Sequence, residues 1–224
     1  MSLAALIGDL LPQAVAIAIS PLPIIAVILM LLAPRAVPVA VAFLAGWLVA
    51  VAAVATVMAL CSSLILDADA ASSRPIIGTA KIVLGTLLLF LAVRQIRQRN
   101  TSDTSAPPPW MNAIEHLAPM RAAGIGFLLA AVNPKNLLLG MTAGVTIGTS
   151  GTTLGTAVGA TAVYVVIASL SVAAPVVAYV AFGELARAKL DPARAWLTAH
   201  SGAIVTTLFL ISGVMTIGKG IGSF

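Results

Sequence analysis

Charged side chains are rare in this chain. Asp, Glu, Lys and Arg make up 8% of its 224 residues, whereas a soluble domain carries about 25%. Hydrophobic residues make up 60%, and the mean hydropathy is +1.10. A soluble fold of this length could not bury so many apolar side chains, so the surplus must face lipid. We therefore expect an integral membrane protein.

Cysteine and histidine are also scarce. Cys61 is the single cysteine, which excludes a disulfide framework and paired-thiol redox chemistry. Because His116 and His200 fall in predicted loops, we expect no metal site. The chain has no phosphate-binding lysine loop, no paired carboxylates and no Ser/His/Asp set at membrane depth. We expect neither an enzyme nor a cofactor, and the lack of central carboxylates argues against a carrier of metal cations.

Apolar stretches long enough to cross a bilayer, which takes about 20 residues, occur six times. They cover residues 6–32, 37–62, 76–96, 122–148, 153–182 and 202–222. We predict an all-α membrane protein with six transmembrane helices. The first stretch follows no basic segment, so we interpret it as a span rather than a cleaved signal peptide.

Basic residues collect in alternate loops and predict the orientation. If the N-terminus is outside, the cytoplasmic side holds eight of them: Arg35, Arg94, Arg97, Arg99, Arg121, Arg187, Lys189 and Arg194. The outer side holds Arg74 and Lys219, with Lys81 just inside the third span. The positive-inside rule then places both termini outside, in a multi-pass protein of the inner (plasma) membrane. The net charge of +5 serves topology here, so we expect no nucleic-acid partner.

The first and fourth spans share a motif. Ala18-Ile19-Ser20-Pro21-Leu22-Pro23-Ile24-Ile25 aligns without gaps with Ala131-Val132-Asn133-Pro134-Lys135-Asn136-Leu137-Leu138, at an offset of 113 residues that also pairs Gly46 with Gly159. We predict two three-helix repeats, 1–96 and 122–224, joined by a cytoplasmic linker over 97–121. Because each repeat has an odd number of spans, the second is inverted relative to the first.

Proline residues interrupt both matching spans. Proline lacks a backbone N–H and clashes with the carbonyl four residues back, so we expect free carbonyls at Ile17, Ile19 and Ala130. In hydrocarbon such groups need a protein, water or ligand partner. We predict a polar substrate or ion site where the breaks meet, formed by Ser20, Pro21, Pro23, Asn133, Pro134, Lys135 and Asn136.

Lys135 is the most specific residue of this site. It lies about 20 Å along the fourth span from Arg121, at 1.5 Å per residue, and a central lysine costs about 2.5–3.5 kcal/mol on insertion scales. It could attract an anionic substrate group, couple transport to protons by losing its own proton, or tie helices together. Lys81, Gly46 and Gly159 are possible cavity-lining residues. Gly46, Gly85, Gly159 and Gly213 are candidates for close helix packing.

The two proline motifs resemble those of the lysine-exporter superfamily, which has a proline motif in the first helix and Asn-Pro-Lys in the fourth. The run from Ser20 to Leu29, followed by Ala33-Pro34-Arg35, is more similar to the peptidoglycolipid- and sulfolipid-addressing (GAP) branch. So are Phe43-Leu44-Ala45-Gly46-Trp47 and the pair Lys81 and Gly85. The resemblance covers nearly the whole chain and implies transport of a glycolipid, or its precursor, to the cell surface.

Three functions remain open from the sequence. The first is a secondary transporter that exposes the site to each side in turn as the two halves rock. The second is an accessory subunit of a larger lipid exporter, which the small size of the chain favours. The third is an exporter of amino acids or small solutes, although Ser-Pro-Leu-Pro replaces the Pro-Gly-Pro usual in amino-acid exporters. The expected partners are a membrane lipid or glycolipid, a larger lipid transporter and a second copy of the chain.

Overall fold

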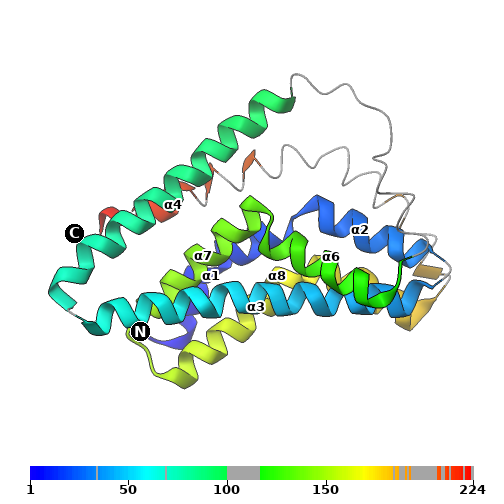
Figure 1. Ribbon diagram of the computed structural model, residues 1–224, viewed down its shortest axis with the longest axis horizontal. Coiled ribbons are helices and arrows are strands. Elements are labelled where there is room, and N and C mark those ends of the chain that lie inside the picture. The colour runs from blue at the N-terminus through cyan, green and yellow to red at the C-terminus, as the bar shows by residue number, and fades with distance from the viewer. Residues whose placement is uncertain are drawn as a thin grey trace.

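The computed structural model describes residues 1–33, 35–68, 70–99 and 117–183, with short pieces between 185 and 222. All regular elements among these residues are α-helices (Figure 1). They are α1 (Leu3–Ala18), α2 (Pro21–Leu32), α3 (Ala36–Ala68), α4 (Ala70–Arg99), α6 (Pro119–Ala131), α7 (Pro134–Gly148) and α8 (Leu154–Phe182). The all-α prediction therefore holds for the described part of the chain.

The predicted first and fourth spans are both bent helix pairs. The axes of α1 and α2 differ by 54°, and those of α6 and α7 by 67°. Among the described residues, two helices are long and apolar enough to cross a membrane, over Ala36–Leu64 and Leu154–Phe182, or up to four if each bent pair is one span. The predicted third span lies inside α4, whereas the structure describes the sixth, 202–222, only in short pieces between 206 and 222.

The two bent pairs run in opposite directions. In Figure 1, α1 and α2 lead from the N-terminal end of the molecule to its far end, whereas α6 and α7 lead back. The long helices α3 and α8 are likewise opposed. α3 packs along α6 and α7, and α8 packs along α1 and, over a smaller contact, α2. Each long helix therefore lies against the bent pair from the other half of the chain.

Local sequence signals set the helix starts. The Ser2 hydroxyl accepts a hydrogen bond from the Ala5 N–H at 3.3 Å and caps α1, and Thr153 caps α8 in the same way. Proline begins α2, α6 and α7, where its missing N–H removes no helix bond. A proline in the middle of a helix would disrupt it, but these prolines stand at the first position of a new helix.

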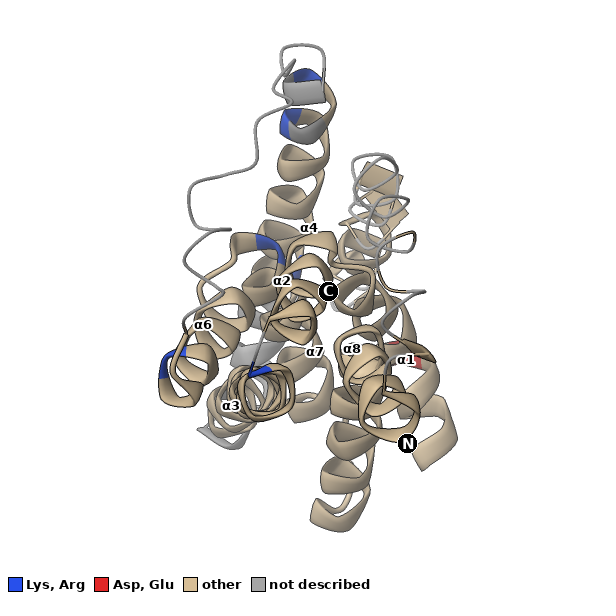
Figure 2. Cartoon of the chain, turned by 90° about the vertical axis from the view of Figure 1, so that its right-hand side faces the viewer, with Lys and Arg blue, Asp and Glu red and all other residues tan. Residues whose placement is uncertain are grey.

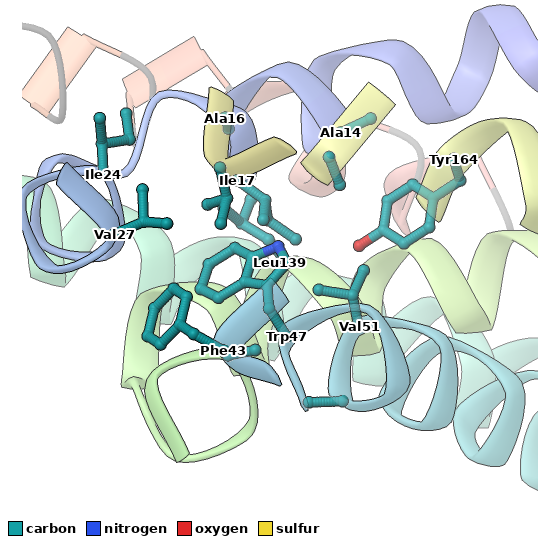
Figure 3. Packing of buried hydrophobic residues seen from close by; sticks show 14 of the residues in the cluster. Ala14, Ala16, Ile17, Ile24, Val27, Phe43, Trp47, Val51, Leu139 and Tyr164 are labelled. Carbon is teal, nitrogen blue, oxygen red and sulfur yellow. The ribbon is translucent and has the colours of Figure 1, made fainter. Parts of the chain in front are cut away.

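The apolar core lies where these helices meet (Figure 3). Trp47 and Phe43 of α3 are fully buried and pack with Ile17 of α1 and Leu139 of α7. The outer faces of the helices are also apolar, and Val49 is 60% exposed. Broad apolar surfaces are rare on soluble monomers, so these faces suit contact with lipid.

Glycines allow close contact between helices. A Cβ on Gly46 would lie 1.9 Å from the Ala123 carbonyl oxygen of α6, and one on Gly126 would lie 2.2 Å from the Phe43 carbonyl oxygen. A Cβ on Gly85 would lie 2.8 Å from the carbonyl oxygen of Gly213. Close packing is therefore confirmed at Gly46, Gly85 and Gly213, three of the four predicted glycines.

Some helices extend beyond the predicted spans, whose limits in the membrane stay a prediction. α3 continues to Ala68 and α4 begins at Ala70, although hydropathy placed a polar turn between 62 and 76. At the two edges of the predicted linker, 97–121, α4 ends at Arg99 and α6 begins at Pro119; residues 100–116 lie outside the described part. Hydropathy marks the hydrocarbon layer, whereas a helix can continue past it because its backbone hydrogen bonds are internal.

Basic residues gather toward one end of the molecule. Arg35 precedes α3, Arg121 lies in the first turn of α6, and Arg94 and Arg97 lie in the last turns of α4. Figure 2 looks onto this end, with basic residues in blue at the starts of α3 and α6 and at the end of α4. The N-terminus lies at the opposite end in Figure 1.

Candidate functional site

The two helix breaks have the same local geometry. Ser20 precedes Pro21 with φ −93° and ψ 109°, and Asn133 precedes Pro134 with φ −63° and ψ 117°. The residue before a proline is driven to extended conformations by contact with the proline ring. One helix therefore ends, an extended residue follows, and a new helix starts at the proline in a different direction.

Side chains of the second break reach the first. The Lys135 ammonium donates hydrogen bonds to the Ser20 hydroxyl at 2.9 Å and to the Ile19 carbonyl at 3.4 Å. The Ser20 hydroxyl in turn donates to Oδ1 of Asn136 at 3.0 Å. The Asn136 amide donates to the Leu129 carbonyl near the end of α6 at 3.0 Å. This continuous chain of hydrogen bonds, the break cluster, joins the two halves of the protein.

The break cluster is buried. Ser20 is 3% exposed, Asn136 3% and Lys135 7%. The two acceptors of the ammonium are neutral oxygens, and no carboxylate in the described part of the chain forms an ion pair with it. These neutral partners accept two hydrogen bonds from the ammonium but leave its charge uncompensated. The cluster therefore favours the approach of an anion.

Carbonyls freed at the breaks have partners. Ile19, one of three positions expected to have a free carbonyl, accepts from Lys135. The Ala18 carbonyl accepts a hydrogen bond from the Ser171 hydroxyl of α8, and Leu129 accepts from Asn136. Ala18 and Leu129 were not anticipated. Their carbonyls are free because α1 and α6 end here, and the last turn of any helix leaves its carbonyls without intrahelical donors.

The remaining predicted residues lie apart from the hydrogen-bonded cluster. Asn133 caps α7, its side chain accepting from the Lys135 N–H at 3.1 Å. Pro21, Pro23 and Pro134 are in the first turns of α2 and α7 and set their directions. Gly46 packs on the α6 backbone, which makes it a helix-contact residue.

Two predicted lining residues lie elsewhere. A Cβ on Gly159 would meet Leu3 of α1 at 3.6 Å, an ordinary contact distance. Lys81 is half-buried on α4. Their predicted role in lining a cavity stays a prediction.

Three residues near the junction of the halves are not among the predicted site residues. Ser171 binds the Ala18 carbonyl. The indole nitrogen of Trp47 and the hydroxyl of Tyr164 are buried without a hydrogen-bond partner. A serine or a lone aromatic residue in an apolar helix carries no periodic signal, so only the packed helices reveal these positions. No group of three or more potential metal ligands occurs among the described residues.

Comparison with known families assigns the chain as a whole. No curated protein and no solved structure matches it. The sequence profile described as Sap, sulfolipid-1-addressing protein, matches residues 10–222. This match covers both helix breaks and supports the sulfolipid-addressing part of the resemblance, whereas the wider lysine-exporter superfamily stays a prediction. The chain therefore belongs to the sulfolipid-1-addressing protein family, and this membership implies a role in sulfolipid addressing.

Proposed function

We propose that the chain is a transporter-like membrane protein, without enzymatic activity, that moves a sulfolipid or its precursor toward the cell surface. The anionic headgroup contacts Lys135, Ser20 and Asn136, with Asn133 fixing the start of α7. The observation that carries this proposal is the break cluster, because a buried ammonium with only neutral hydrogen-bond partners lies where the two halves of the chain meet. Sulfate esters carry the single negative charge that such a group attracts.

The proposed architecture is six spans in two inverted repeats. The opposite directions of the bent pairs support it, as does the packing of each long helix on the bent pair of the other half. The basic end of the molecule (Figure 2) supports a cytoplasmic position for the starts of α3 and α6 and an outside N-terminus in the plasma membrane. Alternating access then follows from rocking one half against the other.

Two half-helices point their N-termini toward the cluster. α2 begins beside Ser20, and α7 begins beside Lys135. The N-terminus of a helix carries about half a positive charge because its first N–H groups are unpaired. The N-termini of α2 and α7 therefore attract an anion together with the ammonium of Lys135. Broken helices in secondary transporters likewise point their N-termini at anionic groups of the substrate.

The decisive experiment is Lys135→Met. Methionine is unbranched and one atom shorter than lysine, and it removes the charge. A buried lysine costs about 2.5–3.5 kcal/mol of insertion free energy, so we expect a folded variant that is at least as heat-stable as the natural chain. Surface sulfolipid, measured by lipid analysis of the outer envelope at matched expression, should fall to the level of a deletion strain.

The matched control is Arg97→Met, which removes an exposed positive charge at the end of α4 and should leave export intact. Normal export by Lys135→Met would contradict the proposal. A second arm reconstitutes the purified chain in vesicles and measures movement of a labelled sulfated glycolipid. Export in cells together with inactivity in vesicles would favour an accessory role beside a larger lipid exporter.

A further inference from the structure

Three buried hydrogen-bonding groups in the described part of the chain have no partner, at Trp47, Tyr164 and Ser169, and the first two belong to aromatic residues of the core. Trp47 is 0% exposed and Tyr164 is 1% exposed, yet neither the Trp47 indole nitrogen nor the Tyr164 hydroxyl forms a hydrogen bond with the described part of the chain. An unsatisfied buried polar group costs about 1–3 kcal/mol. Phenylalanine would fill most of either position without this cost. The two groups therefore call for an explanation beyond packing.

The two groups lie close to the break cluster. The Tyr164 hydroxyl is 3.9 Å from the point that a Cβ on Gly140 would occupy, and Gly140 follows Asn136 by one turn of α7. Four residues of helix span about 6 Å. Figure 3 shows the Tyr164 hydroxyl and the Trp47 indole nitrogen pointing into the same part of the core, beside Leu139.

Opposite halves of the chain supply the two aromatic residues. Trp47 comes from α3, and Tyr164 comes from α8. Both side chains point between α1 and α7, the helices that carry Ile17 and Leu139 (Figure 3). The donors therefore lie at the same junction as the break cluster, one helical turn farther along α7.

The chemistry of the donors defines the group they would bind. An indole N–H only donates, and a phenol O–H donates and can also accept. Both are neutral, whereas the ammonium of Lys135 supplies a positive charge at the junction. A ligand that fits carries a single negative charge at one end and uncharged oxygen acceptors about one helical turn away. A sugar that bears a sulfate ester has this arrangement.

We propose that Trp47 and Tyr164 form a second binding station that donates hydrogen bonds to the uncharged oxygens of a sulfated sugar headgroup, while its sulfate lies at Lys135. This inference rests on the proposed function and names the substrate class of the same site. Tyr164 and Trp47 then select for the sugar, and Lys135 selects for the anion.

The test is Tyr164→Phe, which removes the hydroxyl and keeps the ring. The purified protein is placed in phosphatidylcholine nanodiscs that contain sulfogalactosylceramide, galactosylceramide or neither. Inorganic sulfate is added to a fourth sample as the anion without a lipid. Thermal unfolding and titration with the sulfated lipid then report stability and affinity separately. Tyr179→Phe is the matched control, because it makes the same change in a half-buried tyrosine of α8, about 22 Å away along the helix.

We expect the sulfated lipid to raise the melting temperature of the natural chain more than galactosylceramide or inorganic sulfate does. Tyr164→Phe should melt at the same or a higher temperature without lipid, because it removes an unpaired hydroxyl. Its affinity for the sulfated lipid should fall roughly 3- to 10-fold, the effect of one neutral hydrogen bond. Tyr179→Phe should match the natural chain in both measurements.

Unchanged affinity of Tyr164→Phe, with normal binding by the natural chain, would overturn this inference and leave the proposed function standing. So would a lower melting temperature of Tyr164→Phe without lipid, because the hydroxyl would then have a structural partner. An equal response to inorganic sulfate and to the sulfated lipid would also overturn it, since the sugar would contribute nothing. If the natural chain does not respond to the sulfated lipid, the proposed function fails and this inference fails with it.

Discussion

The contact between α3 and α6 can be tested with a pair of identical substitutions in the two halves. Gly46 and Gly159 are equivalent at the offset of 113 residues, but their surroundings differ. A Cβ on Gly46 would be 1.9 Å from the Ala123 carbonyl oxygen, whereas one on Gly159 would have Leu3 at 3.6 Å. Gly46→Ala and Gly159→Ala therefore add the same methyl group, but only the one at Gly46 would clash with a neighbouring helix.

The structure sets the size of the effect. To bring the new Cβ from 1.9 Å to an ordinary contact at 3.4 Å, α6 must recede by about 1.5 Å. A gap of 0.5–1 Å already loses about a quarter to a half of the attraction between contacting atoms. The neighbouring contact of Gly126 with the Phe43 carbonyl would also open. We expect Gly46→Ala to destabilise the fold by about 1–3 kcal/mol, the usual cost of overpacking, or more.

Gly159→Ala should instead be neutral or stabilising, because alanine favours a helix over glycine by about 1 kcal/mol. The assay is denaturant unfolding of both purified variants in the same detergent, followed by circular dichroism at one protein concentration. The midpoint of Gly46→Ala should be lower than that of the natural chain, and the midpoint of Gly159→Ala should be equal or higher. A Gly46→Ala variant as stable as Gly159→Ala would refute the close α3–α6 contact and the arrangement of the helices built on it.

Two further predictions concern the break cluster and the topology. Ser20→Ala removes one acceptor of the Lys135 ammonium and should destabilise the protein by about 1–3 kcal/mol. Ser63→Ala removes a hydroxyl that donates to the Leu60 carbonyl of the same helix at an exposed position, and it should change the free energy of unfolding by less than about 0.5 kcal/mol. Equal effects of the two substitutions would contradict the importance of the cluster. With the native cysteine replaced by serine, a cysteine introduced at Ser2 should react with an impermeant maleimide in intact cells. One introduced at Met120, which is 83% exposed, should react only after permeabilisation, and the reverse pattern would overturn the orientation.

Much of the fold could be predicted from the sequence because membranes impose simple rules. A chain with 8% charged residues must bury its backbone in helices, since hydrocarbon offers no hydrogen-bond partners. Proline acts locally, through its own ring and missing N–H, so Pro21 and Pro134 mark the breaks wherever the helices lie. The long apolar run around Lys135 is also a local signal, because a lysine at membrane depth marks a candidate site whichever helices it contacts.

Tertiary structure alone decided which groups meet. The Lys135 ammonium donates to the Ser20 hydroxyl, and the Ser171 hydroxyl donates to the Ala18 carbonyl. These partners meet because helices far apart in the sequence pack at angles that no local signal contains. The close approach at Gly46 and the looser contact at Gly159 differ although the motif pairs them. Side-chain periodicity reports which face of a helix is apolar, but the partner of a polar atom depends on the position of another helix. For this reason the unpaired donors of Trp47 and Tyr164 become visible only in the folded chain.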